Sequence, residues 1–285
     1  MSDRPAAALV LVGTPIGNLG DLSPRAVEEL RTADVIAAED TRRTRGLLTH
    51  AGIPAGRRLR AVHARNEAAA ADRIVGEIRD GDRVAVVTDA GMPGISDPGA
   101  HLVRACLDAG LRVEAVPGPS AALTAVVLSG LPSDRFVFEG FLPRKGRARA
   151  ERLAAVAGEP RTTVLFEAPN RVRVTLADLI AACGPHRPVA LARELTKVFE
   201  DVWRGTLADA VRHVERTEPR GEHVVVVGPA PERAPHGDAE IEAAVRAALA
   251  DGRSARDAAS DVANALGVAR RRAYEAATRL KPARR

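Results

Sequence analysis

Short apolar runs alternate with stretches of helical period along this 285-residue chain, and this alternation constrains the fold more than any other feature. Apolar residues recur every three or four positions in residues 24–31 and 69–79, a spacing that indicates amphipathic helices. Strands that alternate with helices form βαβ units, in which the strands are parallel. The sequence therefore predicts an α/β fold with a mostly parallel sheet. The expected strands are residues 8–12, 35–38, 59–62, 83–88 and 112–116.

A second series of strands and helices follows the turn-rich stretch "SGLPSDR" at residues 129–135. Its expected strands are residues 136–141, 163–166, 189–192 and 224–227. The composition then changes at "GPAPERAPHGD", whose Pro and Gly content is typical of a linker, and an Ala-rich helical stretch follows from 239 to 280. We therefore expect three parts: an α/β domain at residues 1–130, a second α/β domain at 131–232 and a helical region at 237–285.

Two helices joined at Gly267 are expected in the last part, within "RDAASDVANALGVARRRAYEAA". The second of them starts with three arginines, a feature of helix-turn-helix motifs that bind nucleic acid. An αα-hairpin that simply packs on a core has the same pattern, so both interpretations stand. The residues expected on the buried face of the first helix are Ala258, Ala259, Val262, Ala263 and Leu266.

Basic residues cluster although the formal net charge is only +5. The clusters are "PRKGRARAER" at residues 143–152 and the C-terminal "RRRAYEAATRLKPARR". Such clusters indicate an anionic partner such as nucleic acid, or else solvated helices in an Arg- and Ala-rich protein. No apolar stretch is long enough to predict a membrane span, and the N-terminus does not resemble a signal peptide. We therefore expect a soluble, cytoplasmic protein with two buried thiols, Cys106 and Cys183.

Four loops that follow expected strands are the first places to look for a ligand, because open α/β sheets bind ligands at the carboxyl ends of their strands. The loop "GTPIGNLGDLS" has neither the spacing of a dinucleotide-binding loop nor that of a phosphate-binding P-loop. In "AEDTRRT", Glu39 and Asp40 are candidates for a base and its positioning partner, although Asp40 is also a typical helix N-cap.

The other two loops are rich in Gly and Pro. They are "VTDAGMPGISDPG" at residues 87–99 and "VPGPSAA" at 116–122, where the backbone N–H groups at a helix start suit a carboxylate or phosphate. Together the four loops predict a ligand cradle built mainly of backbone, with few candidate nucleophiles. A cofactor that carries an already activated group would need few nucleophilic side chains, which accounts for the composition of these loops.

Seven motifs follow one another along the chain: "LVGTPIGNLGDLSPRAVEEL", "AEDTRRTRGLL", "VTDAGMPGISDPG", "VPGPSAALTAVVLSGLP", "FEGFLPRKGRAR", "FEAPNRV" and "ARELTKVFEDVWRGTL". In this order they resemble the family of bacterial methyltransferases I of small-subunit ribosomal RNA, which has the tetrapyrrole methylase fold. The resemblance covers residues 9–228 and the C-terminal region. It implies a two-domain α/β homodimer that transfers a methyl group from S-adenosylmethionine to the ribose 2′-oxygen of a cytidine in 16S ribosomal RNA.

The resemblance also implies cofactor-binding residues, which we carry over position by position onto these motifs. The expected cofactor contacts are Ile16, Asp89, Gly91, Met92, Ile95, Ser96, Ser120, Ala121, Phe166, Glu167 and Ala168. One motif departs from the family, which commonly has His-Glu-His-Asn-Glu where this chain has "VHARNEA" and keeps only His63, Asn66 and Glu67. A lone histidine is more often a structural residue than a base, and without companion ligands we expect no metal site.

Methyl transfer to a hydroxyl is helped by a general base, because the hydroxyl must lose its proton. The candidates near strand ends are Glu39, Asp40, Asp97, Glu194 and Lys197. For Lys197 a phosphate contact or the covering of apolar surface is an alternative role, and Glu194 is equally suited to pair with an arginine. The residues expected to contact RNA are Arg42, Arg43, Arg144, Lys145, Arg147, Arg149, Arg270, Arg271 and Arg272.

Three other functions are alternatives to this one. A methylase of a tetrapyrrole or another small anionic substrate has no need of the basic clusters outside the cleft. A non-catalytic RNA-binding assembly factor binds the cofactor without transferring its methyl group. A metal-dependent hydrolase that uses Asp89, Asp97 and His63 is disfavoured, because Asp is common in Gly- and Pro-rich turns for backbone reasons. With few aromatic residues in the chain, we expect little recognition of bases by stacking.

Overall fold

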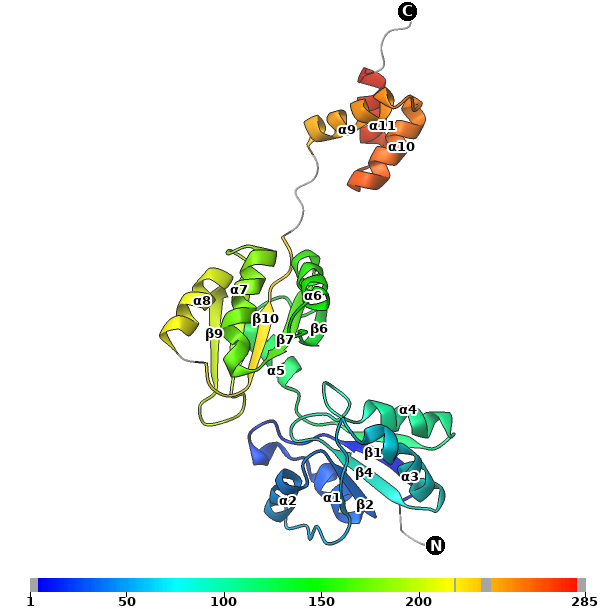
Figure 1. Ribbon diagram of the computed structural model, residues 1–285, viewed down its shortest axis with the longest axis vertical. Coiled ribbons are helices and arrows are strands. Elements are labelled where there is room, and N and C mark those ends of the chain that lie inside the picture. The colour runs from blue at the N-terminus through cyan, green and yellow to red at the C-terminus, as the bar shows by residue number, and fades with distance from the viewer. Residues whose placement is uncertain (1–4, 218, 232–236, 281–285) are drawn as a thin grey trace, which may run out of the picture. The chain divides into compact units, whose positions relative to one another are not determined.

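The computed structural model describes residues 5–217, 219–231 and 237–280, and the chain divides into two compact units, residues 1–230 and 231–285. The larger unit contains two five-stranded sheets, and the smaller one is helical (Figure 1). The expected α/β fold with a helical C-terminal region is therefore confirmed. Among the described residues, no helix is long and apolar enough to cross a membrane.

The first sheet is entirely parallel, with strand order β3-β2-β4-β1-β5. Its central strand β4 is buried along its whole length, so helices must cover both faces. α1 and α2 contribute Leu30 and Leu48 to the core on one face, and α3 and α4 contribute Ile74 and Leu102 to the core on the other. The strands are β1 (Ala8–Val12), β2 (Val35–Ala38), β3 (Leu59–Ala61), β4 (Arg83–Val87) and β5 (Val113–Val116).

The helices of this part start and end where the sequence signals them. Ser23 caps α1 by accepting a hydrogen bond from the Ala26 N–H group, and Pro24 occupies the first helical position. Since all five strands run in the same direction, the loops that follow β1, β2, β4 and β5 come to one edge of the sheet. The helices are α1 (Pro24–Thr32), α2 (Thr41–His50), α3 (Glu67–Arg79), α4 (Ala100–Asp108) and α5 (Ala121–Ser129).

The second sheet is mixed, with strand order β6-β7-β10-β8-β9. Only β6 and β7 are parallel, and the other neighbours are antiparallel, so the expectation of mostly parallel strands is wrong for this sheet. β9 was not expected from the sequence, because its half-buried residues carry no clear apolar run; it is an edge strand paired with β8. The strands are β6 (Phe136–Phe141), β7 (Thr162–Glu167), β8 (Pro188–Arg193), β9 (Asp201–Thr206) and β10 (His223–Val227).

Helices cover both faces of the second sheet. One core lies under α6 (Arg147–Gly158), α7 (Val172–Cys183) and α8 (Leu207–Arg216). The core on the other face contains Ala122, Ala125 and Val126 of α5, a helix that the sequence groups with the first series of strands. Ile16 from the loop after β1 lies in this same core, so the loops of the first sheet are anchored on the second.

The smaller unit consists of α9 (Asp238–Ala250), α10 (Ala255–Leu266) and α11 (Arg270–Leu280) packed around a core of their own. Of the five residues expected on the buried face of α10, four are buried and Leu266 is partly buried. Gly267 ends α10 with φ +62°, in the left-handed region that a glycine adopts without strain. The predicted linker at residues 228–238 and the last basic residues, 281–285, lie partly or wholly outside the described residues.

Candidate active site

A cavity of about 790 Å³ lies where the loops of the first sheet meet the second sheet. The loops after β1, β2, β4 and β5 supply residues to its wall, and so do β6, β7 and the start of β10. This volume is within the range of sites for nucleotide-sized ligands. All eleven residues expected to contact the cofactor line the cavity: Ile16, Asp89, Gly91, Met92, Ile95, Ser96, Ser120, Ala121, Phe166, Glu167 and Ala168.

The loop after β4 is held in a defined shape on one side of the cavity. Thr14 and Gly91 exchange two backbone hydrogen bonds, of 2.9 and 3.1 Å. The Gly94 N–H group donates to the Pro98 carbonyl at 2.9 Å, which closes the loop. Gly91 has φ +81°, and Ser96 has φ +64°, a conformation that costs energy for a residue with a side chain. The Gly- and Pro-rich stretch at residues 87–99 therefore forms a cavity wall whose backbone conformation is defined by these hydrogen bonds.

Glu67 fixes the far end of this loop. Its carboxylate is 5% exposed and accepts hydrogen bonds from the N–H groups of Gly99 at 2.8 Å, His101 at 2.9 Å and Leu102 at 3.3 Å. The last two belong to the first turn of α4, where a carboxylate satisfies free N–H groups. His63, from the same motif, is exposed. Glu67 is thus a structural anchor that sequence reasoning could not recognise, because its partners lie more than thirty residues away.

Two glycines bring the loops after β1 and β5 into backbone contact. A Cβ atom added to Gly118 would lie 2.8 Å from the carbonyl carbon and Cα of Gly13, and one added to Gly13 would lie 2.6 Å from the Gly118 nitrogen. Neither site has room for any side chain. Ser120 then caps α5 by accepting a hydrogen bond from the Leu123 N–H group at 3.4 Å. The first turn of α5 therefore begins at the cavity wall.

Aromatic rings gather on the side formed by the second sheet. Phe138 and Phe166 pack edge to face with ring centres 4.9 Å apart, and Phe141 and Phe166 do so at 5.7 Å. Four of the five phenylalanines of the chain line the cavity, including Phe136. Phe141 is 56% exposed. The sequence did not predict this aromatic cluster, because it does not show that β6 and β7 are adjacent in the sheet.

The candidate catalytic residues fall into two groups. Glu39 and Asp97 line the cavity, whereas Asp40, Glu194 and Lys197 do not belong to its lining. Asp40 caps α2 by accepting hydrogen bonds from the N–H groups of Arg42 and Arg43, which lower the pKa of its carboxyl group. The alternative interpretation of Asp40 as a helix cap is therefore confirmed.

Glu194 and Lys197 pair with each other beside the cavity. The Lys197 ammonium donates to Glu194 at 3.0 Å and to Glu222 at 3.2 Å. Glu194 has φ +49°, which identifies this turn as a strained segment. Gly17, in the loop after β1, approaches the turn so closely that a Cβ atom would lie 2.8 Å from the Leu195 carbonyl oxygen. The pair thus lies in a contact between two loops.

The arginines expected to contact RNA differ in exposure. Arg43 lines the cavity and lies 3.4 Å from Asp89, and the Arg42 side chain is 88% exposed. Arg144, Lys145 and Arg147 are exposed and follow Phe141 closely in the chain. In the smaller unit, Arg272 pairs with Asp238 at 2.7 Å, Arg271 lies 3.6 Å from Glu275, and Arg270 is exposed at the start of α11.

Arg149 contradicts its expected role as an RNA contact. It is 7% exposed, and its guanidinium donates to Asp178 at 2.8 Å, to the Pro143 carbonyl at 2.9 Å and to the Thr175 hydroxyl at 3.0 Å. The Thr175 hydroxyl in turn donates to the Glu167 carboxylate at 2.5 Å. Arg149 therefore faces the core and supports a residue of the cavity wall. The composition of a basic run does not tell which of its members points inward.

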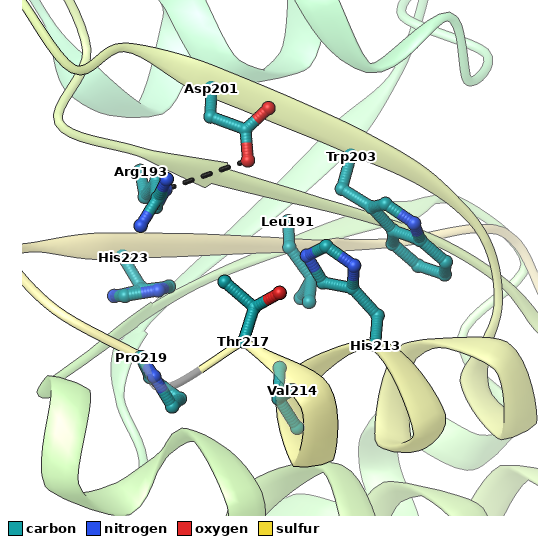
Figure 2. A pocket seen from close by; sticks show the side chains of 9 residues that line it. All are labelled: Leu191, Arg193, Asp201, Trp203, His213, Val214, Thr217, Pro219 and His223. Carbon is teal, nitrogen blue, oxygen red and sulfur yellow. Dashed lines mark ion pairs between the residues drawn. The ribbon is translucent and has the colours of Figure 1, made fainter.

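A second, much smaller pocket of about 20 Å³ lies between β8, β9 and α8 (Figure 2). Arg193 and Asp201 pair across its upper part at 3.5 Å, and the rings of Trp203 and His213 stack with centres 5.0 Å apart. His223 borders both this pocket and the large cavity, and burial lowers its pKa. The space is suited to about one water molecule, so we do not regard it as a substrate site.

Comparison with known proteins agrees with this fold. The family described as Tetrapyrrole (Corrin/Porphyrin) Methylases matches residues 8–211. A solved uroporphyrin-III-C-methyltransferase from Thermus thermophilus, 24% identical, superposes on 78% of this chain and 94% of its own with a TM-score of 0.56, which supports the fold.

Two curated relatives are named ribosomal RNA small subunit methyltransferase I. The one from Xylella fastidiosa is 53% identical over 77% of this chain and 80% of its own length. The one from Synechocystis is 43% identical over 96% of this chain and 98% of its own length. Because the match spans nearly the whole chain, this protein belongs to the tetrapyrrole methylase family and, within it, to the ribosomal RNA small subunit methyltransferase I family.

Proposed function

We propose that this protein transfers a methyl group from S-adenosylmethionine to the ribose 2′-hydroxyl of a cytidine in 16S ribosomal RNA. The names of the curated relatives support methylation of small-subunit ribosomal RNA. The observation that carries the proposal is the cavity, because every residue expected to contact the cofactor lies in its lining.

The chemistry of the lining fits this cofactor. Five carboxylates face one arginine and one histidine in the wall, an excess of negative charge that favours a cationic ligand. Ile16, Met92 and the phenylalanines other than the exposed Phe141 provide apolar surface for the adenosine part, and the Gly- and Pro-rich loops expose backbone donors and acceptors. When bound, S-adenosylmethionine supplies a methyl group on a positively charged sulfur that is a good leaving group. The carboxylates are Glu39, Asp89, Asp97, Glu167 and Glu222.

The residues of the chain then act mainly by binding and orientation. Holding a hydroxyl and a methyl donor in line supplies much of the acceleration expected for such a transfer. The contact between Gly13 and Gly118 and the anchoring of the β4 loop by Glu67 keep the walls in place for that purpose. The remaining task is to accept the proton of the hydroxyl group.

The RNA is proposed to bind at the edge of the cavity, where exposed basic residues begin. Arg144, Lys145 and Arg147 follow the exposed Phe141, and Arg42 and Arg43 lie at the start of α2. Contacts of this kind with phosphates predict binding that weakens steeply as the salt concentration rises. Arg270 and Arg271 in the smaller unit are proposed as additional contacts.

The experiment that tests the function is transfer of labelled methyl from S-adenosylmethionine to small ribosomal subunits from a strain that lacks this protein. Naked ribosomal RNA is assayed in parallel, and the label is mapped by nuclease digestion. We expect label in a 2′-O-methylated cytidine. Absence of label from both substrates, with the cofactor bound tightly, would exclude the proposed function in favour of a small-molecule methylase or a non-catalytic assembly factor.

We further propose that the protein is a cytoplasmic homodimer, as its resemblance to the family implies. Exposed apolar residues suitable for an interface are Leu123 and Val127, one turn apart on α5, with exposures of 54% and 75%. Light scattering of the full chain tests this proposal, and a mass of one chain at micromolar concentration would contradict it. The three-part division at residues 130 and 232 also stays a prediction, which limited proteolysis can test.

A further inference from the structure

Four of the five carboxylates in the cavity wall are engaged with donors or cations. Asp89 lies 3.4 Å from the Arg43 guanidinium, and Glu222 accepts from the Lys197 ammonium at 3.2 Å. Glu167 accepts a hydrogen bond from the Thr175 hydroxyl at 2.5 Å, and Glu39 accepts one from the Asp89 N–H group at 3.4 Å. Each of these four side chains therefore has a partner within the chain.

Asp97 is the exception. No hydrogen bond or ion pair joins its carboxylate to any other residue in the described part of the chain, although the side chain is partly buried in the cavity wall. Its backbone is nevertheless well fixed. The hydrogen bond from Gly94 to Pro98 closes the loop around it, and Glu67 anchors the next turn at Gly99. A carboxylate held in place without a partner is free to accept a hydrogen bond from a substrate.

The surroundings of Asp97 favour its protonated form. Burial is the main cause, and the negative charges of Glu39, Asp89 and Glu222 add to it, so the pKa of Asp97 rises to about 7. These groups come from the ends of β2 and β4 and from the start of β10, while Arg43, Glu167 and His223 are the other charged or titratable groups in the lining. A general base is most effective when its pKa lies near the working pH.

We propose that Asp97 is the general base of the reaction, accepting the proton of the hydroxyl group that receives the methyl group. This proposal rests on the proposed function. The hydroxyl oxygen forms a bond to the methyl carbon while the carbon–sulfur bond breaks and its electron pair remains on sulfur. The hydroxyl proton passes to a carboxylate oxygen of Asp97, which later releases it to water.

The test uses Asp97→Asn, which keeps the shape of the side chain but cannot accept the proton at neutral pH. Single-turnover methylation of small ribosomal subunits is measured from roughly pH 5.5 to 9, a range that spans the expected titration. For the wild type, the rate should rise with pH and level off above an apparent pKa near 7. For Asp97→Asn, we expect a rate about 10²–10⁴-fold lower that no longer follows this titration.

Binding provides a readout that does not depend on turnover. The affinity of each variant for S-adenosylhomocysteine, the product without a charge on its sulfur, is measured by calorimetry. Asp97→Asn should keep the wild-type affinity within about threefold if the fold is intact. The matched control is Asp108→Asn, the same chemical change at an exposed residue of α4 that pairs with Arg104 at 3.0 Å. It should leave both rate and affinity unchanged.

Several outcomes would overturn the proposal. They are an Asp97→Asn rate within about threefold of the wild type, a wild-type rate independent of pH over this range, or loss of the titration in Glu39→Gln instead. If Asp97→Asn fails to bind the product, the pH profiles of the wild type and of Glu39→Gln together still decide the question. Absence of methyl transfer by the wild type itself would refute the proposed function, which is a separate result.

Discussion

Replacement of Gly118 by alanine tests the close contact between the loops after β1 and β5. The added Cβ atom would lie 2.8 Å from Gly13, whereas ordinary contacts of such atoms begin at 3.4 Å, so the loops must separate by about 0.6 Å. The nearest atoms belong to the backbone, so no side-chain rotation relieves the clash. Overpacking of this kind costs about 1–3 kcal/mol in the free energy of unfolding.

The assays are thermal unfolding and calorimetric binding of S-adenosylmethionine. For a unit of this size, the midpoint temperature should fall by about 2–4 °C for each kcal/mol lost. Because Gly118 lines the cavity, we also expect cofactor affinity to fall about tenfold, which corresponds to about 1.4 kcal/mol. Gly76→Ala is the matched control, since this glycine lies inside α3 with nothing within 4 Å of an added Cβ atom. That change should raise stability by about 0.5–1 kcal/mol.

The double variant Gly13→Ala/Gly118→Ala sharpens the test. One separation of the two loops relieves the backbone clash of both substitutions, while the flexible Met92 side chain, 2.8 Å from a Cβ atom on Gly13, can move aside. The double variant should therefore lose less unfolding free energy than the sum of the losses of the two single variants, as expected for residues in contact. Unchanged midpoint temperature and cofactor affinity in Gly118→Ala would refute the reasoning. It would mean that the two loops are not held together in the folded protein.

Three further predictions follow from the site. Glu67→Ala leaves three N–H groups at the start of α4 without their acceptor, so it should cost about 1–3 kcal/mol of unfolding free energy and weaken cofactor binding; an unchanged denaturation curve would argue against this anchor. Phe141→Ala should raise the KM for ribosomal subunits by about 5–100-fold through loss of a stacking surface, while cofactor affinity is kept. Val174→Ala, at another exposed apolar residue, should leave this KM unchanged, and equal effects of the two substitutions would reject a base contact at Phe141. Because the pKa of Asp97 is raised from 3.8 to about 7, the folded protein binds this proton more tightly than the unfolded chain. The unfolding free energy should therefore fall as the pH rises between these values, and a parallel fall in Asp97→Asn would contradict the assignment.

Much of the fold could be predicted because its signals are local. Ser23 with Pro24 marks the start of α1, Ser120 the start of α5, and Gly267 the end of α10, and the structure confirms each. These features depend on hydrogen bonds and dihedral angles within a few residues, which a short stretch of sequence specifies. The four loops of the first sheet that line the cavity could also be predicted, since loops after parallel strands meet at one edge of a sheet, whereas the individual cofactor contacts were expected from the resemblance to the family.

The sequence by itself thus determined the order of the elements, the helix caps and the loops that form the cavity. The tertiary structure alone decided that β9 completes the second sheet as an edge strand, that α5 packs on that sheet, and that Arg149 points inward. It also decided which carboxylate of the cavity remains without a partner. Burial and pairing depend on segments that are far apart in the chain. Arg43 therefore becomes a neighbour of Asp89, and Asp97 becomes buried near other carboxylates, only in the folded protein.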